Sequence, residues 1–377
     1  MGFSDADGSK RILYVCEYGT AMGGERSLLT WLPHVIAAGW DVHVMAPAEG
    51  PFVAELSKLP IQHTAWPAFT HQARSRLAFR REFLTNIIRQ LQPHLVHANS
   101  LSMSRVVGPL TRELNVRSIG HVRDIVRISA QAMRDVNDNT RVLTVSHATA
   151  DWHFAQGLNR QLTHILYNGI DLTHFIPRPA TGYLHDELKL PRDTQLLAAI
   201  GQVGMRKGLD ILLAAMPEIV TTFPSVHLLV IGERTSIKDE AIAFEEQLHL
   251  AASQSPLSGH VHFLGYRTDI ASLLNELTLL IHAARQEPLG RVLLEAAASG
   301  VPIVATDVGG TREILDADSG RIIPPDSPAQ LSRSVIELLG DPVVMVKQAA
   351  VARTGIEARF SAHASAESLL QHYSALT

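Results

Sequence analysis

Two glutamates eight residues apart lie just before and inside a predicted helix whose first turn could bind an anion. Glu287 precedes a Pro-Leu-Gly turn, and Glu295 lies about one and a half turns into the helix predicted over residues 290–299. The first turn of this helix offers unpaired backbone N–H groups and the positive end of the helix dipole. Carboxylates beside such a site suit a ligand with hydroxyl groups to grip and a diphosphate to neutralise. A sugar nucleotide has both.

A pair of adjacent cations forms a second candidate group. Arg206 and Lys207 lie in the loop between a predicted strand, residues 195–200, and the helix that follows it. Arginine can bind a diphosphate through two parallel hydrogen bonds, and lysine can act on it as a point charge. We therefore expect this strand-to-helix junction to neutralise a diphosphate.

Length and composition are those of an ordinary globular protein. The 377 residues are enough for two domains, and 46% hydrophobic with 19% charged residues is typical of globular chains. The net charge of −4 excludes a general attraction to nucleic acid or to an anionic membrane. The single cysteine, Cys16, excludes an internal disulfide framework and fits a reducing compartment, so we expect a cytoplasmic protein. We expect neither a signal peptide nor a membrane-spanning segment.

Strands and helices that alternate along the chain must position these groups. Residues 11–16 predict a buried strand, and a loop with Gly19, Gly23 and Gly24 leads into a helix over residues 25–38. This order opens a doubly wound α/β domain, although the glycine spacing does not match the G-x-G-x-x-G pattern of dinucleotide-binding domains. The alternation continues and predicts parallel sheets. Further strands are predicted over residues 41–46, 94–98, 116–122, 141–145, 162–167, 195–200, 226–231, 261–264, 277–281 and 302–306, and longer helices over residues 74–91, 102–114, 238–252 and 362–375.

Polar residues at predicted strand ends are further candidates. His121, Arg123 and Asp124 follow a strand, at the edge where open α/β sheets bind ligands. His121 can line an active site or be a hydrogen-bonded structural histidine, and the sequence leaves both possibilities open. His94 and His97 lie three residues apart in a strand, so they point to opposite faces and are not expected to bind one metal ion.

The arginine-rich segment over residues 74–91 predicts an amphipathic helix. A basic amphipathic helix can lie on an anionic membrane, which would suit a transferase that acts on a lipid and would place it at the inner face of the cell membrane. The same helix can instead pack on the sheet and leave its basic face in solvent. We favour the second interpretation.

The run E-P-L-G-R-V-L-L-E-A-A-A-S-G-V-P-I-V-A-T, residues 287–306, resembles the E-x7-E segment of the family 4-type glycosyltransferases. These are retaining enzymes of the GT-B fold, in which two doubly wound Rossmann-like domains flank a cleft. The resemblance implies an acceptor-side domain over residues 1–172, completed by a C-terminal helix within 360–377, and a nucleotide-sugar-binding domain over residues 173–359. Y-N-G-I-D at 167–171 resembles the family's crossing between the domains.

The resemblance also implies roles for individual residues. Lys207 would grip the diphosphate, Glu295 the ribose, and Glu287 would act through position and charge, not as a nucleophile. The F-L-G-Y-R-T-D loop at 263–269 resembles the loop on which the nucleotide base rests. The implied catalytic residues are Glu287, His121, Lys207 and Arg206. The implied donor-binding residues are Gly23, Gly24, Gln202, Tyr266, Arg267, Leu289, Gly290, Arg291, Val292, Leu293 and Glu295.

Two positions depart from the family pattern. Gln202 stands where the family usually has an arginine, so compensation of the diphosphate charge would fall to Arg206. The residues at 282–284, His-Ala-Ala, stand where the family usually has Pro-Ser after the strand. We expect this second change to affect packing more than chemistry.

The reaction that this resemblance implies moves a hexose-type sugar, with retention, from a nucleotide donor such as a UDP- or GDP-sugar. The acceptor would be a glycan, a lipid-linked sugar or a small molecule. No metal or other cofactor is implied, because the D-x-D patterns at 5–7 and 316–318 fit turns and not a metal site.

Two other functions stay open. One is a nucleotide-sugar epimerase or a phosphorylase on the same fold. The other is a degenerate regulatory subunit that binds sugar nucleotides, which Gln202 and the missing Pro-Ser favour slightly. Glu287, Lys207 and Glu295 are intact and count against it.

Overall fold

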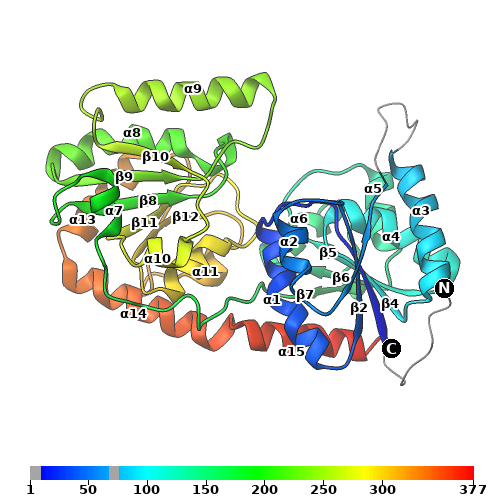
Figure 1. Ribbon diagram of the computed structural model, residues 1–377. Coiled ribbons are helices and arrows are strands. Elements are labelled where there is room, and N and C mark those ends of the chain that lie inside the picture. Colours follow the sequence, from blue (N-terminus) through cyan, green and yellow to red (C-terminus); the bar gives the residue numbers. More distant parts are fainter. Residues whose placement is uncertain (1–9, 68–75) are drawn as a thin grey trace. The chain divides into compact units, whose positions relative to one another are not determined.

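The computed structural model describes residues 10–67 and 76–377, which divide into two units. The first unit comprises the described residues up to Gly169 together with Ala362–Thr377, and the second comprises Ile170–Ser361. The end of the chain therefore returns to the first unit. In Figure 1 the red C-terminal helix α15 (Ala362–Ser374) lies against the blue helix α1 (Gly23–Ala37).

A seven-stranded parallel sheet in the order β3-β2-β1-β4-β5-β6-β7 forms the first unit. Its strands are β1 (Arg11–Val15), β2 (Asp41–Ala46), β3 (Gln62–Ala65), β4 (Leu95–Ala98), β5 (Arg117–Val122), β6 (Arg141–Thr144) and β7 (Thr163–Ile165). Besides α1 and α15, its helices are α2 (Pro51–Leu56), α3 (Arg76–Leu91), α4 (Leu101–Leu114), α5 (Ala130–Asn137), α6 (His147–Phe154) and the 3-10 turn η1 (Arg160–Leu162).

A six-stranded parallel sheet in the order β10-β9-β8-β11-β12-β13 forms the second unit. Its strands are β8 (Gln195–Ile200), β9 (Val226–Ile231), β10 (Val261–Gly265), β11 (Leu279–His282), β12 (Ile303–Thr306) and β13 (Arg321–Ile323). Its helices are α7 (Tyr183–Leu188), α8 (Leu209–Thr222), α9 (Asp239–Ser253), α10 (Ile270–Leu274), α11 (Arg291–Ala298), α12 (Thr311–Ile314), α13 (Pro328–Leu339) and α14 (Pro342–Arg359), with the 3-10 turn η2 (Met205–Lys207).

The central strand β8 is apolar on both faces, as expected for a strand of a parallel sheet whose two faces are covered by crossover helices. In β8, Leu196, Leu197 and Ala198 are fully buried. Leu197 packs with residues of α8, β9 and α13 in one continuous core. The prediction of doubly wound parallel sheets is confirmed in both units.

Element boundaries agree with the prediction to within about two residues. The helix predicted over 290–299 is α11, and the strand predicted over 302–306 is β12. One boundary changes the description of a candidate group, because Gly23 and Gly24 form the first turn of α1 and not the loop before it. The predicted helix over 74–91 is α3 from Arg76 onward, and its first two residues lie outside the described residues.

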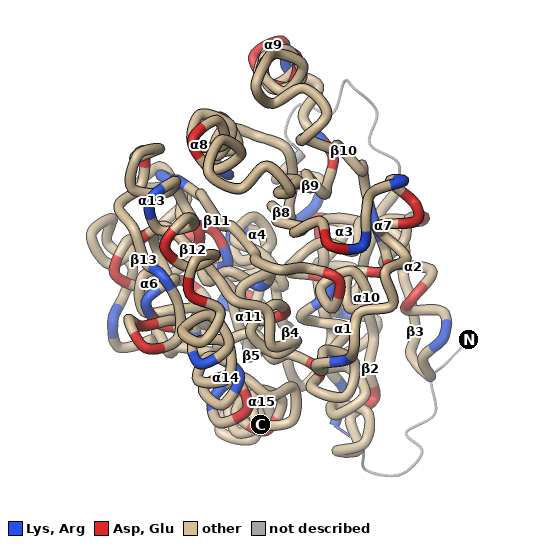
Figure 2. Tube along the Cα trace, turned by 90° about the vertical axis from the view of Figure 1, so that its left-hand side faces the viewer, with Lys and Arg blue, Asp and Glu red and all other residues tan. Residues whose placement is uncertain are grey.

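Charged residues of both signs alternate along the chain. Figure 2 shows basic and acidic residues interspersed along the tube of each unit. This distribution agrees with the small net charge of −4.

Candidate functional site

The order of the strands in the second sheet reverses between β8 and β11, which are hydrogen-bonded neighbours. In open parallel sheets, ligands bind at such a reversal, beyond the carboxyl ends of the two strands. The loop after β8 carries Arg206 and Lys207, and the loop after β11 carries Glu287. A small pocket opens at this point, and its lining includes Gly201, Lys207 and His282. The topology thus joins two predicted groups that lie 80 residues apart in sequence.

Lys207 and Glu287 form a buried ion pair. Lys207 Nζ donates to Glu287 Oε2 over 2.5 Å, and the two side chains are 13% and 10% exposed. His282, the last residue of β11, places its Nε2 3.0 Å from the same oxygen, although without the geometry of a good hydrogen bond. One carboxylate oxygen therefore faces both an ammonium group and an imidazole ring.

These contacts set the charges in the site. Burial alone would raise the pKa of Glu287, but the positive charge of Lys207 and the contact with His282 outweigh it and hold the pKa far below the ordinary range. Burial lowers the pKa of His282, and the positive charge of Lys207 lowers it further, against the opposite effect of Glu287. At neutral pH the site therefore holds a carboxylate next to a neutral imidazole.

Gly208 allows the loop with Lys207 to approach the loop after β11. Its φ of +63° lies in the left-handed region, and a Cβ at this position would lie 1.9 Å from the carbonyl oxygen of Ala283. Glycine alone meets both requirements without strain. Because η2 ends at Lys207, directly before Gly208, this close approach also determines where Lys207 lies relative to Glu287.

Gly208→Ala is expected to lower the free energy of unfolding by about 3 kcal/mol, because the methyl group adds left-handed strain and overlap with Ala283. Gly204→Ala is the matched control. Gly204 lies in the same loop with extended backbone, and no atom lies within 4 Å of the Cβ that it would gain. Urea unfolding of both variants measures the difference. Equal stability of the two variants would contradict this account of the loop.

Arg285 ties the same two loops together. Its backbone N–H donates to the carbonyl oxygen of Arg206 over 2.8 Å, and its Nη1 donates to the carbonyl oxygen of Met205 over 2.8 Å. The guanidinium also binds both carboxylate oxygens of Asp210, over 2.8 and 2.7 Å, and Asp326 over 2.6 Å. These contacts hold the backbone of η2, so Arg285 supports the position of the neighbouring Lys207.

The N-terminus of α11 is open, as the sequence predicted. Gly290 is the N-cap residue, with φ +103°, and no side chain caps the helix. The N–H groups of Leu293 and Leu294 return to the carbonyl oxygen of Gly290, over 3.0 and 3.3 Å. Within the described residues, the N–H groups of Gly290, Arg291 and Val292 have no acceptor. They present the positive end of this helix within five residues of Glu287.

The side chains around the N-terminus of α11 are either buried or paired with each other. Leu289 and Leu293 are buried, at 2% and 0% exposure, so their side chains face the protein interior, and contact of their backbone with a ligand stays a prediction. Arg291 Nε donates to Glu295 Oε1 over 2.8 Å, one helical turn further on. Glu295 is thereby held in a fixed orientation on the inner side of α11, and its role toward a ribose stays a prediction.

Arg206 and Gln202 lie in the same loop and differ in how they are engaged. The side chain of Gln202 donates to Thr235 Oγ1. Arg206 is exposed, and its guanidinium has no hydrogen-bond partner in the part of the chain that the structure describes. Its positive charge still reaches His282, whose pKa it lowers. Arg206 is thus available to an anion, whereas Gln202 holds the loop to its neighbour.

The two residues predicted to contact the nucleotide base, Tyr266 and Arg267, have different surroundings. Tyr266 is 45% exposed, and its backbone N–H donates to Glu233 over 3.1 Å. Arg267 binds Asp269 through two hydrogen bonds of 2.9 and 2.8 Å, and Glu187 through one of 2.6 Å. Two carboxylates therefore match the charge of Arg267. Contact of either residue with a base stays a prediction.

The remaining predicted residues belong to the first unit, near the carboxyl ends of its strands. A Cβ on Gly24 would lie 3.2 Å from the side chain of Arg123, so the missing side chain lets Arg123 pack against this turn, whereas Gly23 faces open space. Arg123 binds the carbonyl oxygen and Oδ1 of Asn99 over 3.1 and 2.9 Å, and Oδ1 of Asn168 over 2.9 Å. Burial lowers the pKa of Arg123 to about 10.

His121 is fully buried in the first unit. Its ring stacks between those of Trp31 and His97, at 5.6 and 5.4 Å between ring centres. Burial and the charge of Arg123 lower the pKa of His121 well below its ordinary value, so the ring is neutral. The sequence left two possibilities open for His121. Its ring packs among other aromatic rings, and a place in the active site stays a prediction.

Helix α3 engages two of its arginines within the unit. Arg80 pairs with Glu17 at 3.1 Å and lies over the ring of Trp66, and Arg81 pairs with Asp135 at 3.0 Å. These two positive charges are matched by carboxylates of the same unit and do not form a free basic face.

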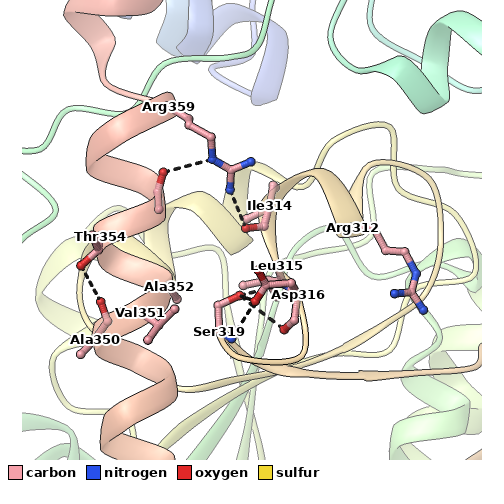
Figure 3. Close-up of a pocket in the computed structure, with 11 residues that line it drawn as sticks. Arg312, Ile314, Leu315, Asp316, Ser319, Ala350, Val351, Ala352, Thr354 and Arg359 are labelled. Carbon is pink, nitrogen blue, oxygen red and sulfur yellow. Dashed lines mark hydrogen bonds between the residues drawn. The ribbon is translucent and has the colours of Figure 1, made fainter.

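A larger pocket in the second unit, of about 550 Å³, lies beside α14 and is shown in Figure 3. Its charged groups are used within the protein. Arg359 donates to the carbonyl oxygens of Glu313 and Ile314 over 3.0 and 3.3 Å. Asp316 accepts from the hydroxyl of Ser319 over 2.7 Å. With its polar groups engaged in this way, the pocket is a weaker candidate than the loops after β8 and β11.

The acidic patterns agree with the prediction where they are described. Asp316 accepts the backbone N–H groups of Asp318 and Ser319, which is turn chemistry as predicted. The pattern at residues 5–7 lies outside the described residues. Across residues 10–67 and 76–377, no three His, Cys, Asp or Glu side chains are grouped as metal ligands. No helix in those ranges is long and apolar enough to cross a bilayer.

Sequence reasoning missed two residues of this site. We expected the change at His282 to affect packing more than chemistry, and that expectation did not include the contact of its ring nitrogen with Glu287 Oε2. A polar residue at the carboxyl end of an otherwise apolar strand, five residues before Glu287, was the available signal. Arg285 carried no such signal, because its partners come from distant segments of the chain.

Two family models match the chain, and together they cover most of it. The model "Glycosyltransferase Family 4" matches residues 21–174, and "Glycosyl transferases group 1" matches residues 183–357. The chain is 26% identical over 352 residues to a phosphatidyl-myo-inositol mannosyltransferase of Mycolicibacterium smegmatis, across 88% of this chain and 85% of that protein. It is 29% identical over 247 residues to a GDP-mannose-dependent monoacylated alpha-(1-6)-phosphatidylinositol monomannoside mannosyltransferase of Corynebacterium glutamicum, across 62% of each.

Solved structures share the fold over nearly the whole chain. HepE of Anabaena, in complex with UDP-glucose, has a TM-score of 0.85 at 22% identity, across 97% of this chain and 99% of that one. A glycosyltransferase from Rickettsia africae has a TM-score of 0.83 at 18% identity, across 98% and 99%. At these identities the likeness shows the fold and not the substrate.

Proposed function

We propose that this chain, which belongs to the family 4-type glycosyltransferases of the GT-B fold, transfers a hexose-type sugar with retention from a nucleotide-sugar donor to an acceptor. The observation that carries the proposal is the buried pair of Lys207 and Glu287, at 2.5 Å, beside the open N-terminus of α11. A cation, a carboxylate and free backbone N–H groups are what a diphosphate joined to a sugar requires.

The positive groups would stabilise the departing diphosphate. Lys207, the exposed Arg206 and the N–H groups at 290–292 supply positive charge where the anion develops during bond cleavage. These groups lie in the loop after β8, which Arg285 holds to the loop after β11, and at the start of α11, so little reorganisation is needed. We further propose that they take the place of a metal ion.

Glu287 would stabilise positive charge on the sugar as the bond to the diphosphate breaks. Its depressed pKa keeps it a carboxylate across neutral pH, which excludes a role as a general acid there. In the proposed step the acceptor oxygen bonds to the anomeric carbon from the face that the diphosphate leaves, and the acceptor proton passes to a diphosphate oxygen. No covalent bond to Glu287 is needed.

The relatives suggest which ligands to examine first. The two relatives described above carry names of mannosyl transfer to phosphatidylinositol lipids, so we include GDP-mannose and inositol-containing acceptors among the candidates. Contact of residues 74–91 with a membrane has less support than transfer of a sugar, since Arg80 and Arg81 already pair with carboxylates. A cytoplasmic place of action is supported by the buried, unpaired Cys16.

The test is a mass-spectrometric screen of the purified protein against UDP-, GDP- and ADP-sugars in the presence of a metal chelator. We expect slow hydrolysis of one donor, with release of its nucleotide, and loss of this activity in Glu287→Ala and Lys207→Ala. Lys58→Ala is the matched control, because Lys58 forms an exposed pair with Glu55 at 2.7 Å. The variant removes the same charge from the surface and should stay active.

Other outcomes of the screen would select the alternatives. An epimerised donor would indicate an isomerase on the same fold. Binding of a donor that is never hydrolysed, even when candidate acceptors are added, would indicate a regulatory subunit. Absence of binding to every donor would contradict the proposal. Once an acceptor is found, the anomeric configuration of the product, read by NMR, decides between retention and inversion.

A further inference from the structure

A buried chain of hydrogen bonds in the first unit connects the C-terminal helix with His121. The hydroxyl oxygens of Tyr14 and Tyr373 lie 2.7 Å apart, and Tyr373 Oη lies 2.7 Å from His97 Nδ1. His97 Nε2 in turn lies 3.2 Å from His121 Nδ1. The four side chains come from β1, α15, β4 and β5, and each has 0% exposure.

Arg123 fixes the direction of this chain at one end. Its Nη2 lies 3.2 Å from His121 Nδ1, and a guanidinium group can only donate hydrogen bonds. His121 Nδ1 must therefore accept. A neutral imidazole carries one proton, so the proton of His121 must be on Nε2. Burial keeps the ring neutral, since it lowers the pKa of His121 well below the ordinary value.

The same logic orients the other members. Because His121 Nδ1 accepts, His97 Nε2 must donate to it. Burial also lowers the pKa of His97, so this ring is neutral and its Nδ1 accepts from the hydroxyl of Tyr373. Tyr373 then accepts from Tyr14. The reverse direction would oppose two lone pairs across 3.2 Å or require a buried imidazolium ion, and both are unfavourable.

We infer that this network holds His121 as a neutral ring with its proton on Nε2, and that Tyr373 and His97 are positioning residues that maintain this state. Within the described residues, Nε2 of His121 has no hydrogen-bond partner, although it is buried. An unpaired buried donor is costly, so its retention fits a group reserved for an oxygen of a ligand. His121 can then donate a hydrogen bond but cannot act as a general base through Nε2. Only the hydrogen bond from His121 to a ligand rests on the proposed function, and the position of the proton does not.

The proton position can be measured directly by NMR of ¹⁵N-labelled histidine side chains in the full-length protein. The chain has 19 histidines, so the signals of His121 are assigned by their loss in His121→Gln. We expect one protonated and one unprotonated nitrogen, with the proton on Nε2, and no change between about pH 6 and pH 8. A proton on Nδ1, or protonation of both nitrogens in this range, would overturn the inference. This result does not depend on whether the protein turns over any donor.

The positioning role is tested by two matched variants. Tyr373→Phe removes the donor to His97 Nδ1, whereas Tyr14→Phe removes a hydroxyl from the same tyrosine pair and leaves that donor in place. We expect Tyr373→Phe to change the nitrogen signals of His97 and His121 and to lower kcat about tenfold with an unchanged donor KM. Tyr14→Phe should do neither. Equal effects of the two variants on the signals would show that the tyrosines are only structural and would overturn the positioning role.

A second pair of variants checks the role of His97 as the link between Tyr373 and His121. The amide of His97→Gln can still accept from Tyr373 and donate to His121, whereas His97→Leu can do neither. We expect the glutamine variant to keep the wild-type nitrogen signals of His121, and most of the rate that the leucine variant loses. If the wild-type protein turns over no donor at all, the NMR result still decides the state of His121, and the failure falls on the proposed function alone.

Discussion

Glu287→Gln should lower turnover of the donor by about 100-fold while leaving the donor KM nearly unchanged. Glutamine keeps the shape of the side chain but removes the negative charge that faces Lys207 Nζ at 2.5 Å and His282 Nε2 at 3.0 Å. That charge matters most when positive charge develops on the sugar, which occurs only in the transition state. A ligand in the ground state loses little, because an amide oxygen can still accept its hydrogen bonds.

Steady-state kinetics of donor hydrolysis, with Glu55→Gln as control, measures this effect. Glu55 is the partner of Lys58 in an exposed pair, so the control makes the same chemical change where no site is involved. A rise in KM as large as the fall in kcat would show that Glu287 only binds the sugar, and would contradict the electrostatic role. Melting curves of both variants separate loss of the fold from loss of catalysis.

Lys207→Met should lower the free energy of unfolding by about 3 kcal/mol at pH 7, because it leaves a buried carboxylate without its cation. Methionine has a similar length and apolar volume, so packing against Gly201 changes little. The variant should also lose donor hydrolysis, since Lys207 is the cation proposed for the diphosphate. The stability effect does not depend on that proposal.

The free energy of unfolding should depend on pH in opposite directions in the wild-type protein and in Lys207→Met. In the wild-type protein the folded pKa of Glu287 is depressed, so its contribution to stability is present above the unfolded pKa of about 4.3 and is lost as pH falls through the folded value. Without Lys207, burial is opposed mainly by the contact with His282, and we expect the folded pKa of Glu287 to rise above the unfolded one. The variant should then lose stability as pH increases through that raised value.

Urea unfolding between about pH 4 and pH 7 distinguishes the two profiles. The stability difference between Lys207→Met and the wild-type protein should be smallest at the acidic end and should grow toward neutral pH. Lys58→Met is the control, and its difference from the wild-type protein should be small at every pH because its pair is exposed. Parallel profiles of Lys207→Met and the wild-type protein would contradict the buried ion pair.

The local structure around Glu287 was predictable because its signals are local. A Pro-Leu-Gly turn, a run of helix formers closed by Gly300 and a short apolar strand each follow from a few neighbouring residues, and α11 and β12 confirm them. The doubly wound units follow from the same kind of pattern repeated along the chain. The boundary at Gly23 was less well predicted, because glycines rarely form the first turn of a helix and α1 obtains its stability from packing.

Contacts between distant segments could not be predicted in this way. His282 was assigned to packing, yet β11 ends so that its ring nitrogen reaches Glu287 Oε2. Arg267 was assigned to a nucleotide base, and two carboxylates already match its charge, one of them from α7. In both cases the contact depends on where a loop lies in the folded protein. Neighbouring residues in the sequence do not indicate that position.

Local patterns in the sequence predicted the two parallel sheets and the open helix end beside Glu287, because periodicity, caps and turns depend on residues close together in the chain. The tertiary structure decided which charges meet. Strand order places β11 beside β8, Gly208 lets their loops touch, and the low exposure of the site makes the pair of Lys207 and Glu287 far stronger than a surface pair. It likewise decided, through Arg123 and a helix from the far end of the chain, which nitrogen of His121 carries the proton.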